Sequence, residues 1–201
     1  MLLIQYYYMK TITGSKLKPP YIPKGWMGTF LQLIRTVKLT QIDSKTIAQY
    51  KIADAANASK VTRALRFLNL IDNEGKIIEE KMNPLRLLGD DYKTSLRKII
   101  ENSYSELFAK LDIEKVRQVD ILNFLIAEYN YSEFQAKQAT ILFSYLCNEA
   151  NIPISPDLVE MNKVVPYKLQ ANNRGTKEKP KERLEKTFAS TDKTISSNDY
   201  I

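Results

Sequence analysis

The sequence lacks histidine entirely and has a single cysteine, Cys147, among its 201 residues. Without an imidazole, the chain cannot build histidine-based metal sites, Ser-His-Asp or Cys-His catalysis, or the usual pH switch near neutrality. One cysteine cannot form a disulfide within the chain, which is typical of a reducing compartment. Cys147 falls in an apolar pattern and has no histidine to act as its base, so we expect it in the core.

Long hydrophobic runs are also missing. No stretch approaches the roughly 20 apolar residues that a transmembrane helix needs. The apolar start of the chain, residues 1–10, has neither the basic leading segment nor the small-residue cleavage site of a signal peptide. We therefore expect a cytoplasmic protein with no membrane partner.

The net charge of +7 is unevenly distributed along the chain. It is +3 over residues 1–20, +4 over 21–83, −3 over 84–166 and +3 over 167–201. A polyanion would therefore be attracted to the N-terminal part and to the C-terminal tail, and repelled by the region between them. The same charge also fits a protein that is merely soluble, because many basic proteins bind no nucleic acid.

The pattern of apolar and turn-forming residues divides the chain into four parts. Residues 1–20 predict an irregular basic lead-in, and residues 21–83 predict a winged helix–turn–helix. Residues 84–166 predict a helical domain, and residues 167–201, which have few apolar anchors, predict a disordered basic tail. The predicted fold class is mainly α.

Three helices and a small hairpin make up the predicted winged helix–turn–helix. Apolar spacing predicts the helices over residues 26–38, 44–51 and 58–70. Asp43 is a suitable N-cap for the second helix. The turn at residues 72–75, with Gly75 free to take a positive φ, lies between apolar residues and predicts a β-hairpin, the wing. The segment 79–81 is expected to end this hairpin.

The predicted third helix has one apolar and one polar face. Val61, Leu65 and Leu68 fall on one arc of the helix, and polar and basic side chains fall on the opposite arc. Such a helix fits the major groove of DNA, where its outer side chains reach base edges and phosphates. The predicted DNA-binding residues are Ser59, Lys60, Thr62, Arg63, Arg66 and Asn69 on this helix, and Lys76 and Lys81 at the hairpin. The alternative is that this face is only solvated and that the module binds protein.

The predicted helical domain is acidic and rich in tyrosine, phenylalanine and leucine. Its helices are expected over residues 92–111, 116–129 and 132–150. Ser132 and Gln135 have the spacing of a capping box at the start of the last helix, and Pro153 and Pro156 are expected to end it. The apolar residues are most simply a core. The region is also a candidate homodimer contact, because most helix–turn–helix proteins bind paired half-sites as dimers.

One arrangement is a candidate for catalysis. Asp72, Glu79 and Lys81 loosely match the two acids and the lysine of metal-dependent nucleases. Such triplets are frequent by chance, and the predicted strands are too short for a nuclease sheet. The chain also has no Gly-rich phosphate loop. We therefore expect no enzyme, no cofactor and no metal site.

Several segments follow an order found in a known family. They are a capped helix from Asp43, a basic helix from Ala58, the block Leu70-Ile71-Asp72-Asn73-Glu74-Gly75, the pattern Tyr104-x-x-Leu107-Phe108, and a helix with Thr140, Phe143, Leu146 and Cys147. Over about residues 20–152, the chain resembles a widespread prokaryotic family catalogued only as a domain of unknown function. The resemblance implies a winged helix-like N-terminal part, a helical C-terminal part and a prokaryotic or mobile-element origin. It implies no catalytic residue. Ala53-Asp54-Ala55 stands where the family often has glycine, which implies a differently shaped loop.

These observations predict a winged-helix DNA-binding protein that acts as a dimer. Its expected role is that of a transcriptional regulator or an accessory protein of a mobile or defence element. The alternative is a non-enzymatic protein–protein interaction module built on the same scaffold.

Overall fold

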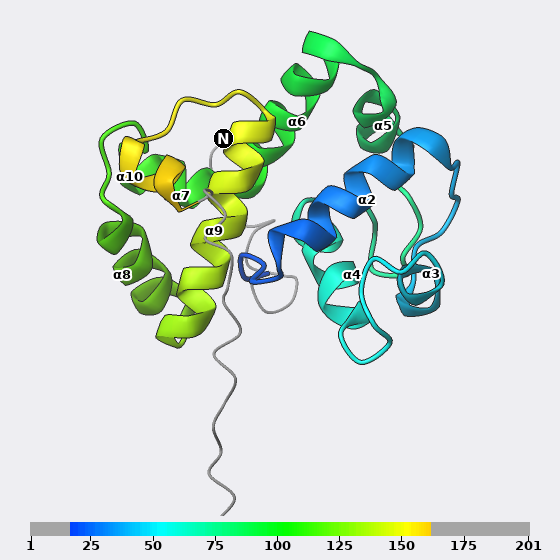
Figure 1. The fold of residues 1–201 in the computed structure, drawn as a ribbon, viewed down its shortest axis with the longest axis horizontal. Coiled ribbons are helices and arrows are strands. Elements are labelled where there is room, and N and C mark those ends of the chain that lie inside the picture. The colour runs from blue at the N-terminus through cyan, green and yellow to red at the C-terminus, as the bar shows by residue number, and fades with distance from the viewer. Residues whose placement is uncertain (1–16, 162–201) are drawn as a thin grey trace, which may run out of the picture. The chain divides into compact units, whose positions relative to one another are not determined.

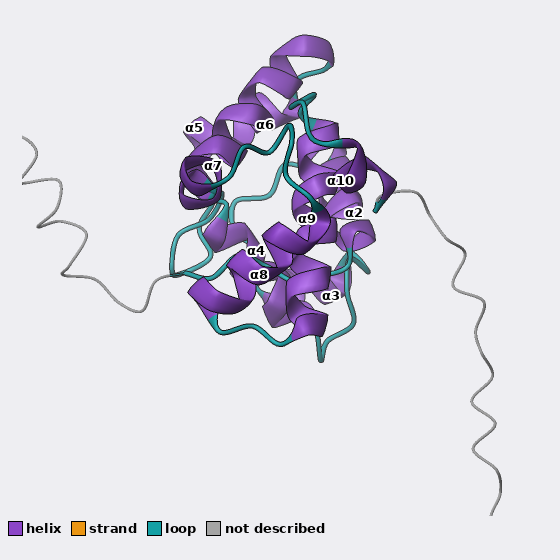
Figure 2. Ribbon diagram, turned by 90° about the vertical axis from the view of Figure 1, so that its left-hand side faces the viewer, coloured by secondary structure: helices purple, strands orange, loops and turns teal. Residues whose placement is uncertain are grey.

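The computed structural model describes residues 17–161, which are almost entirely helix and loop. Figure 2 shows helices joined by loops throughout this range. The prediction of a mainly α protein is therefore confirmed. The predicted disordered tail, residues 167–201, and most of the predicted lead-in lie outside the described residues. None of the described helices combines the length and the apolarity that crossing a bilayer requires.

The first three described helices lie close to their predicted positions. They are α2 (Lys24–Thr36), α3 (Ser44–Gln49) and α4 (Ala58–Phe67), grouped together in Figure 1. Asp43 caps α3 as predicted, because its carboxylate accepts hydrogen bonds from the backbone N–H and the hydroxyl of Thr46, both at 2.8 Å. Val61 and Leu65 of α4 are fully buried, and α4 packs against α3. The predicted apolar side of α4 is thus confirmed.

Helix α4 ends at Phe67 rather than at residue 70. Asn69 takes a left-handed conformation with φ 54°, and the Leu70 N–H donates to the Leu65 carbonyl at 2.9 Å. Asparagine tolerates this conformation and commonly ends helices in this way. The prediction that Asn69 belongs to the polar face of the helix is therefore wrong, since the residue lies beyond its end.

The predicted turn at residues 72–75 is confirmed. The Asp72 carboxylate accepts hydrogen bonds from the backbone N–H groups of Glu74 and Lys76, at 2.9 and 2.8 Å. Gly75 has φ 84°, and a Cβ atom at this position would lie 2.5 Å from the Ile42 carbonyl oxygen. Only glycine fits both requirements, the positive φ and the close approach of the backbone.

The β-hairpin expected around this turn is not confirmed. Two isolated antiparallel bridges, Gln41–Lys76 and Ile71–Ile77, lie beside the turn, and neither extends into a strand within the described range. The segment 79–81 does not end a hairpin, as predicted, but belongs to helix α5 (Glu79–Met82). Two glutamates in the first turn of α5 favour a helix there, because they complement its positive end. The 3₁₀ helix η1 (Asn83–Arg86) follows directly.

Five further helices form the second region, which we define as residues 84–161. They are α6 (Gly89–Ser103), α7 (Ser105–Lys110), α8 (Gln118–Tyr129), α9 (Glu133–Glu149) and α10 (Pro156–Glu160). The single helix predicted over 92–111 is interrupted at Tyr104. The capping box of α9 is confirmed, because Ser132 and Gln135 each accept a hydrogen bond from the backbone N–H of the other. Pro156, predicted as a stop, lies in the first turn of α10, where proline is favoured.

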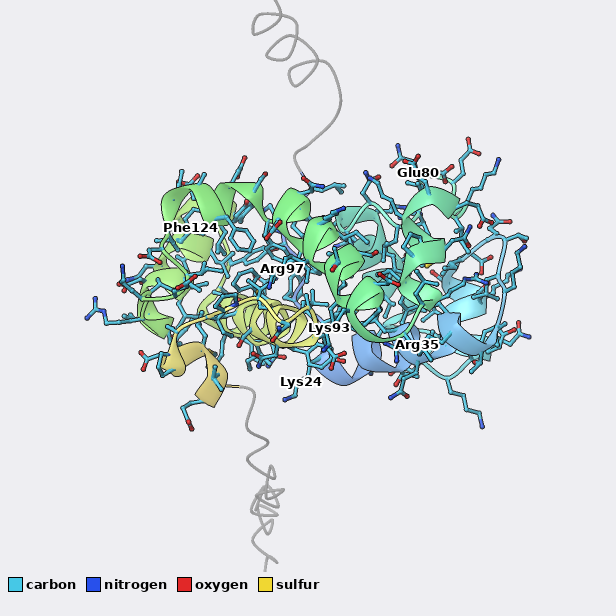
Figure 3. The ribbon with its side chains drawn as sticks, turned by 90° about the horizontal axis from the view of Figure 1, so that it is seen from above. Lys24, Arg35, Glu80, Lys93, Arg97 and Phe124 are labelled. Atoms are coloured by element: carbon cyan, nitrogen blue, oxygen red, sulfur yellow. The ribbon has the colours of Figure 1, made fainter. Side chains whose placement is uncertain are left out.

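The predicted winged-helix and helical parts share one hydrophobic core. Residues 17–161 fall within one compact unit. Figure 1 shows α2 to α5 on one side and α7 to α10 on the other. The ring centroids of Phe67 on α4 and Tyr104 lie 4.9 Å apart, and the Arg35 guanidinium of α2 lies 4.2 Å above the ring of Tyr92 on α6. Figure 3 shows Arg35 on the same face as Lys93 of α6.

Candidate nucleic-acid interface

Helix α4 lines a groove with a volume of about 620 Å³, which we term the basic groove. It is lined by residues 17–22, by Lys60, Arg63, Ala64 and Arg66 of α4, by Asn73, and by Asn130, Tyr131 and Gln135 at the junction of α8 and α9. The N-terminal segment (residues 17–22) lies between α4 and α9 in Figure 1. Three segments that are far apart in the sequence thus form the walls.

Positive charge dominates the basic groove. Lys18 contributes one cation, and Lys60, Arg63 and Arg66 contribute the others. Among the described residues that line the groove, none is aspartate or glutamate. The second region contributes only neutral side chains, although its net charge is negative. Four cations around a concave surface concentrate an attractive potential for phosphate, because the protein walls screen less than water does.

Lys18 is held in place by the second region. Its Nζ donates a hydrogen bond to the Tyr129 carbonyl at 2.6 Å and lies 5.7 Å from the centroid of the Tyr131 ring. The Tyr131 hydroxyl donates a hydrogen bond to the Pro19 carbonyl. Because residues before proline favour extended backbone, Lys18 and Pro19 run along the groove wall instead of folding over it. The N-terminal segment is therefore a fixed wall of the groove.

Two tyrosines lie side by side in this wall. The ring centroids of Tyr21 and Tyr131 lie 5.5 Å apart in an edge-to-face arrangement, and Tyr21 is half-buried. Burial and the neighbouring Tyr21 raise the pKa of Tyr131, whereas the positive charge of Arg63 acts in the opposite direction. The Tyr131 phenol is therefore neutral at physiological pH and keeps its proton for the Pro19 carbonyl. Arg63 and Tyr131 both line the basic groove.

Four of the eight predicted DNA-binding residues lie on the outer side of α4 or at its rim. Ser59, Lys60 and Arg63 are exposed. Arg66 is half-buried, and its Nε donates to the Asp72 carbonyl at 3.3 Å, so this guanidinium also fastens the turn to α4. It still lines the basic groove.

Thr62 is not on the outer face. It is only 4% exposed, and its hydroxyl donates to the Ser59 carbonyl at 3.0 Å. Threonine on a helix often bonds backward in this way, which removes the hydroxyl from other partners. The prediction that Thr62 faces outward to meet DNA is therefore wrong.

The other three predicted residues lie away from the basic groove. Asn69 and Lys81 line a second groove of about 550 Å³, which borders the C-terminal end of α4, shares Leu17 with the basic groove and is termed the mixed groove. It is bounded by residues 67–69, α5, α6, α7 and Tyr129. Lys76 is exposed on the turn and lines neither groove. The eight predicted residues therefore do not form one continuous surface.

Of the residues that line the basic groove, the sequence predicted only Lys60, Arg63 and Arg66 as contacts. Lys18, Tyr21, Asn130, Tyr131 and Gln135 were not among the predicted contacts, yet all of them line it. The capping box that includes Gln135 predicted the start of a helix, but it did not indicate that Gln135 lines a groove. No local sequence pattern indicates this groove, because the contact between Lys18 and Tyr129 joins residues 111 positions apart.

Asp72, which was considered for catalysis, has structural partners. The Asp72 carboxylate accepts from two backbone N–H groups of its own turn. Among the described residues, no three histidine, cysteine, aspartate or glutamate side chains gather as a metal site would require. Cys147 is fully buried, as predicted, and burial raises the pKa of its thiol well above the ordinary value. The thiol therefore stays protonated, which makes it a poor nucleophile.

Comparison of the chain with protein-family models, curated proteins and solved structures gave no significant match. The resemblance to the prokaryotic family therefore remains a resemblance, and the function has to be argued from the geometry.

Proposed function

We propose that this protein binds DNA through the basic groove and the exposed side of α4. The observation that carries the proposal is the lining of that groove, which combines four cations with no carboxylate among the described residues. Nucleic-acid affinity arises largely from neutralised phosphates, and base-edge contacts supply specificity. A groove whose charged side chains are all positive is suited to neutralising phosphates.

The order of elements supports a winged-helix type of module. Three helices are followed by a tight turn, and the bridges Gln41–Lys76 and Ile71–Ile77 bring three short extended segments side by side. This order supports the proposal of a winged helix-like module, in which α4 carries cations toward the nucleic acid. Lys76, exposed on the turn, is then placed to contact a phosphate beside the groove. We propose a cytoplasmic role in transcriptional regulation or as an accessory of a mobile or defence element.

A second candidate is a protein-interaction module, which the surface of the second region favours. Val119 and Ile126 of α8 are 46% and 37% exposed, and Phe134 of α9 is 69% exposed. Exposed apolar side chains of this size commonly mark protein contacts. They are candidates for the homodimer contact proposed for the second region. Such a contact is compatible with DNA binding, since paired half-sites require a dimer.

The test is a fluorescence-anisotropy titration of the full chain with labelled DNA at two salt concentrations. In the variant, Lys60→Ala and Arg63→Ala remove two groove cations together. The matched control, Lys93→Ala with Lys115→Ala, removes two exposed lysines outside the groove, each paired with a neighbouring aspartate. Loss of two phosphate contacts should lower the salt slope by about 2 and the affinity at low salt at least about tenfold.

The control variant should bind like the unmodified protein. Equal losses in both variants would show that only net charge matters, and absence of binding at low salt would leave the protein-interaction candidate. Circular dichroism of both variants checks that the fold is retained.

A further inference from the structure

The shape of the basic groove distinguishes between forms of nucleic acid. We infer that the groove accepts a single strand rather than the edge of a duplex, an inference that rests on the proposed nucleic-acid binding. The deciding observation is that the exposed Lys60 and Arg63 line a concave groove together with the N-terminal segment and the α8–α9 junction.

Reading duplex DNA requires a helix that projects from the protein. The major groove is about 12 Å wide and admits an α-helix only when both flanks of that helix are clear. Here the N-terminal segment runs beside α4, and the Phe67 ring of α4 packs on the Tyr104 ring of the second region. A duplex would therefore meet the rims of the groove before α4 could enter its major groove.

The size and the walls of the groove suit an unpaired strand. Its volume of about 620 Å³ lies within the range of sites that enclose part of a flexible ligand. Single-strand sites combine a positive groove, which follows the phosphates, with aromatic faces on which bases stack. The half-buried ring of Tyr21 lies in the wall, and the Arg63 guanidinium offers a second flat surface for stacking.

Amide side chains around the groove supply groups that read base edges. Asn73, Asn130 and Gln135 all line it. The Gln135 Oε1 accepts the Ser132 N–H at 3.0 Å in the capping box, which leaves both hydrogens of its Nε2 outside that box. Amide donors and acceptors match the Watson–Crick edges of bases, which are accessible only when a strand is unpaired.

The groove is also formed before any ligand arrives. The Tyr131–Pro19 and Lys18–Tyr129 hydrogen bonds fix the N-terminal segment to the α8–α9 junction. Asn130 holds the left-handed conformation, φ 51°, that ends α8. A rigid wall lowers the ordering cost of binding a flexible strand.

The experiment compares labelled oligonucleotides of about 15 residues, as single-stranded DNA, as single-stranded RNA and as blunt duplex DNA, each titrated into the full chain at about 50 mM salt. We expect at least one single strand to bind about tenfold tighter than the duplex. Tyr21→Leu, which removes the ring, should weaken single-strand binding about fivefold or more. Tyr21→Phe, which keeps the ring, should retain the affinity.

A second pair of variants tests the amides. Asn130→Gly removes an amide from the groove and retains the left-handed backbone, because glycine adopts it readily. Asn151→Gly is the matched control, since Asn151 has φ 53° and lies outside the groove. Only Asn130→Gly should weaken single-strand binding, by about threefold or more.

The outcomes separate this inference from the proposed function. Duplex binding as tight as single-strand binding, with Tyr21→Leu and Asn130→Gly behaving like their controls, would overturn the single-strand inference and keep the proposed function. Binding of neither form would overturn both. Thermal melting of each variant distinguishes loss of binding from loss of the fold.

Discussion

Helix α4 borders two grooves of nearly equal size, about 620 Å³ for the basic groove and 550 Å³ for the mixed groove. Their charges differ. The mixed groove has two lysines, Lys81 and Lys98, but also two acids, Glu80 and Glu106. A polyanion would be attracted along the whole basic groove, whereas in the mixed groove it would meet both positive and negative side chains. The two grooves are therefore alike in volume and in their proximity to α4 and differ in the carboxylates of their lining, and this difference is the basis on which we propose the basic groove as the nucleic-acid site.

Gly75→Ala should have the largest effect on stability and should disturb the basic groove more than the mixed groove. Alanine would take a positive φ, and its Cβ would lie 2.5 Å from the Ile42 carbonyl oxygen. We expect unfolding free energy to fall by about 3 kcal/mol, measured by urea denaturation. Gly25→Ala is the control, because a Cβ there meets nothing within 4 Å. The control should be neutral or slightly stabilising.

The same substitution bears on the basic groove, because the turn carries Asn73 and its Asp72 carbonyl accepts from Arg66. Gly75→Ala should therefore weaken DNA binding even at temperatures where the variant stays folded. Equal stability of the two alanine variants would contradict the close approach of Gly75 to Ile42.

Charge reversal at one cation of each groove tests the comparison directly. Arg63→Glu places a carboxylate among the remaining cations of the basic groove, and we expect DNA affinity to fall about 100-fold at low salt. Lys81→Glu makes the same charge change in the mixed groove and should alter affinity by less than about threefold. Anisotropy titration measures both. If Lys81→Glu has the larger effect, the two grooves have been assigned the wrong way round.

Local chemistry made several features of the fold predictable. The Asp43 cap, the Ser132–Gln135 capping box and the glycine turn each depend on a few neighbouring residues, and all of them form as expected. The apolar stripe of α4 was equally predictable, because burial follows helical spacing. These features positioned Lys60 and Arg63 correctly on the outer side of the helix.

The wrong predictions concern residues whose burial or helix membership the helical spacing of the sequence does not decide. Thr62 falls on the polar arc of the helix but is buried, and its hydroxyl donates to the Ser59 carbonyl. Asn69 continues the polar arc but serves as the left-handed residue after the helix. A helical wheel cannot tell where a helix ends, so it counted both residues as outer contacts.

The second region could not be linked to the groove from the sequence. The hydrogen bond between Tyr131 and Pro19 joins residues 112 positions apart, and no spacing rule predicts it. For the same reason the mixed groove, which brings Asn69 and Glu106 together, had no counterpart among the predictions. Contacts between residues far apart in the sequence determine which charged side chains line the same groove. They therefore determine the difference in charge between the two grooves.

Lys18→Met should have the smallest effect and should show whether the N-terminal segment belongs to the interface. Methionine keeps a long flexible stem but loses the charge, the hydrogen bond to the Tyr129 carbonyl and the contact with the Tyr131 ring. Because Lys18 is exposed, we expect little change in unfolding free energy. DNA affinity should fall about three- to fivefold, and the salt slope should fall by about 0.9, the value for one phosphate contact.

The control for Lys18→Met is Lys38→Met, which removes an exposed lysine that lines neither groove. If the two variants give the same salt slope, Lys18 contacts no phosphate, and the cations of α4 alone bind the nucleic acid. If Lys18→Met lowers the slope and Lys38→Met does not, the basic groove acts as one surface assembled from the N-terminal segment and α4. A groove lined by both lysines and glutamates, such as the mixed groove, could not give that result, because any single lysine there would add little to the affinity for a polyanion.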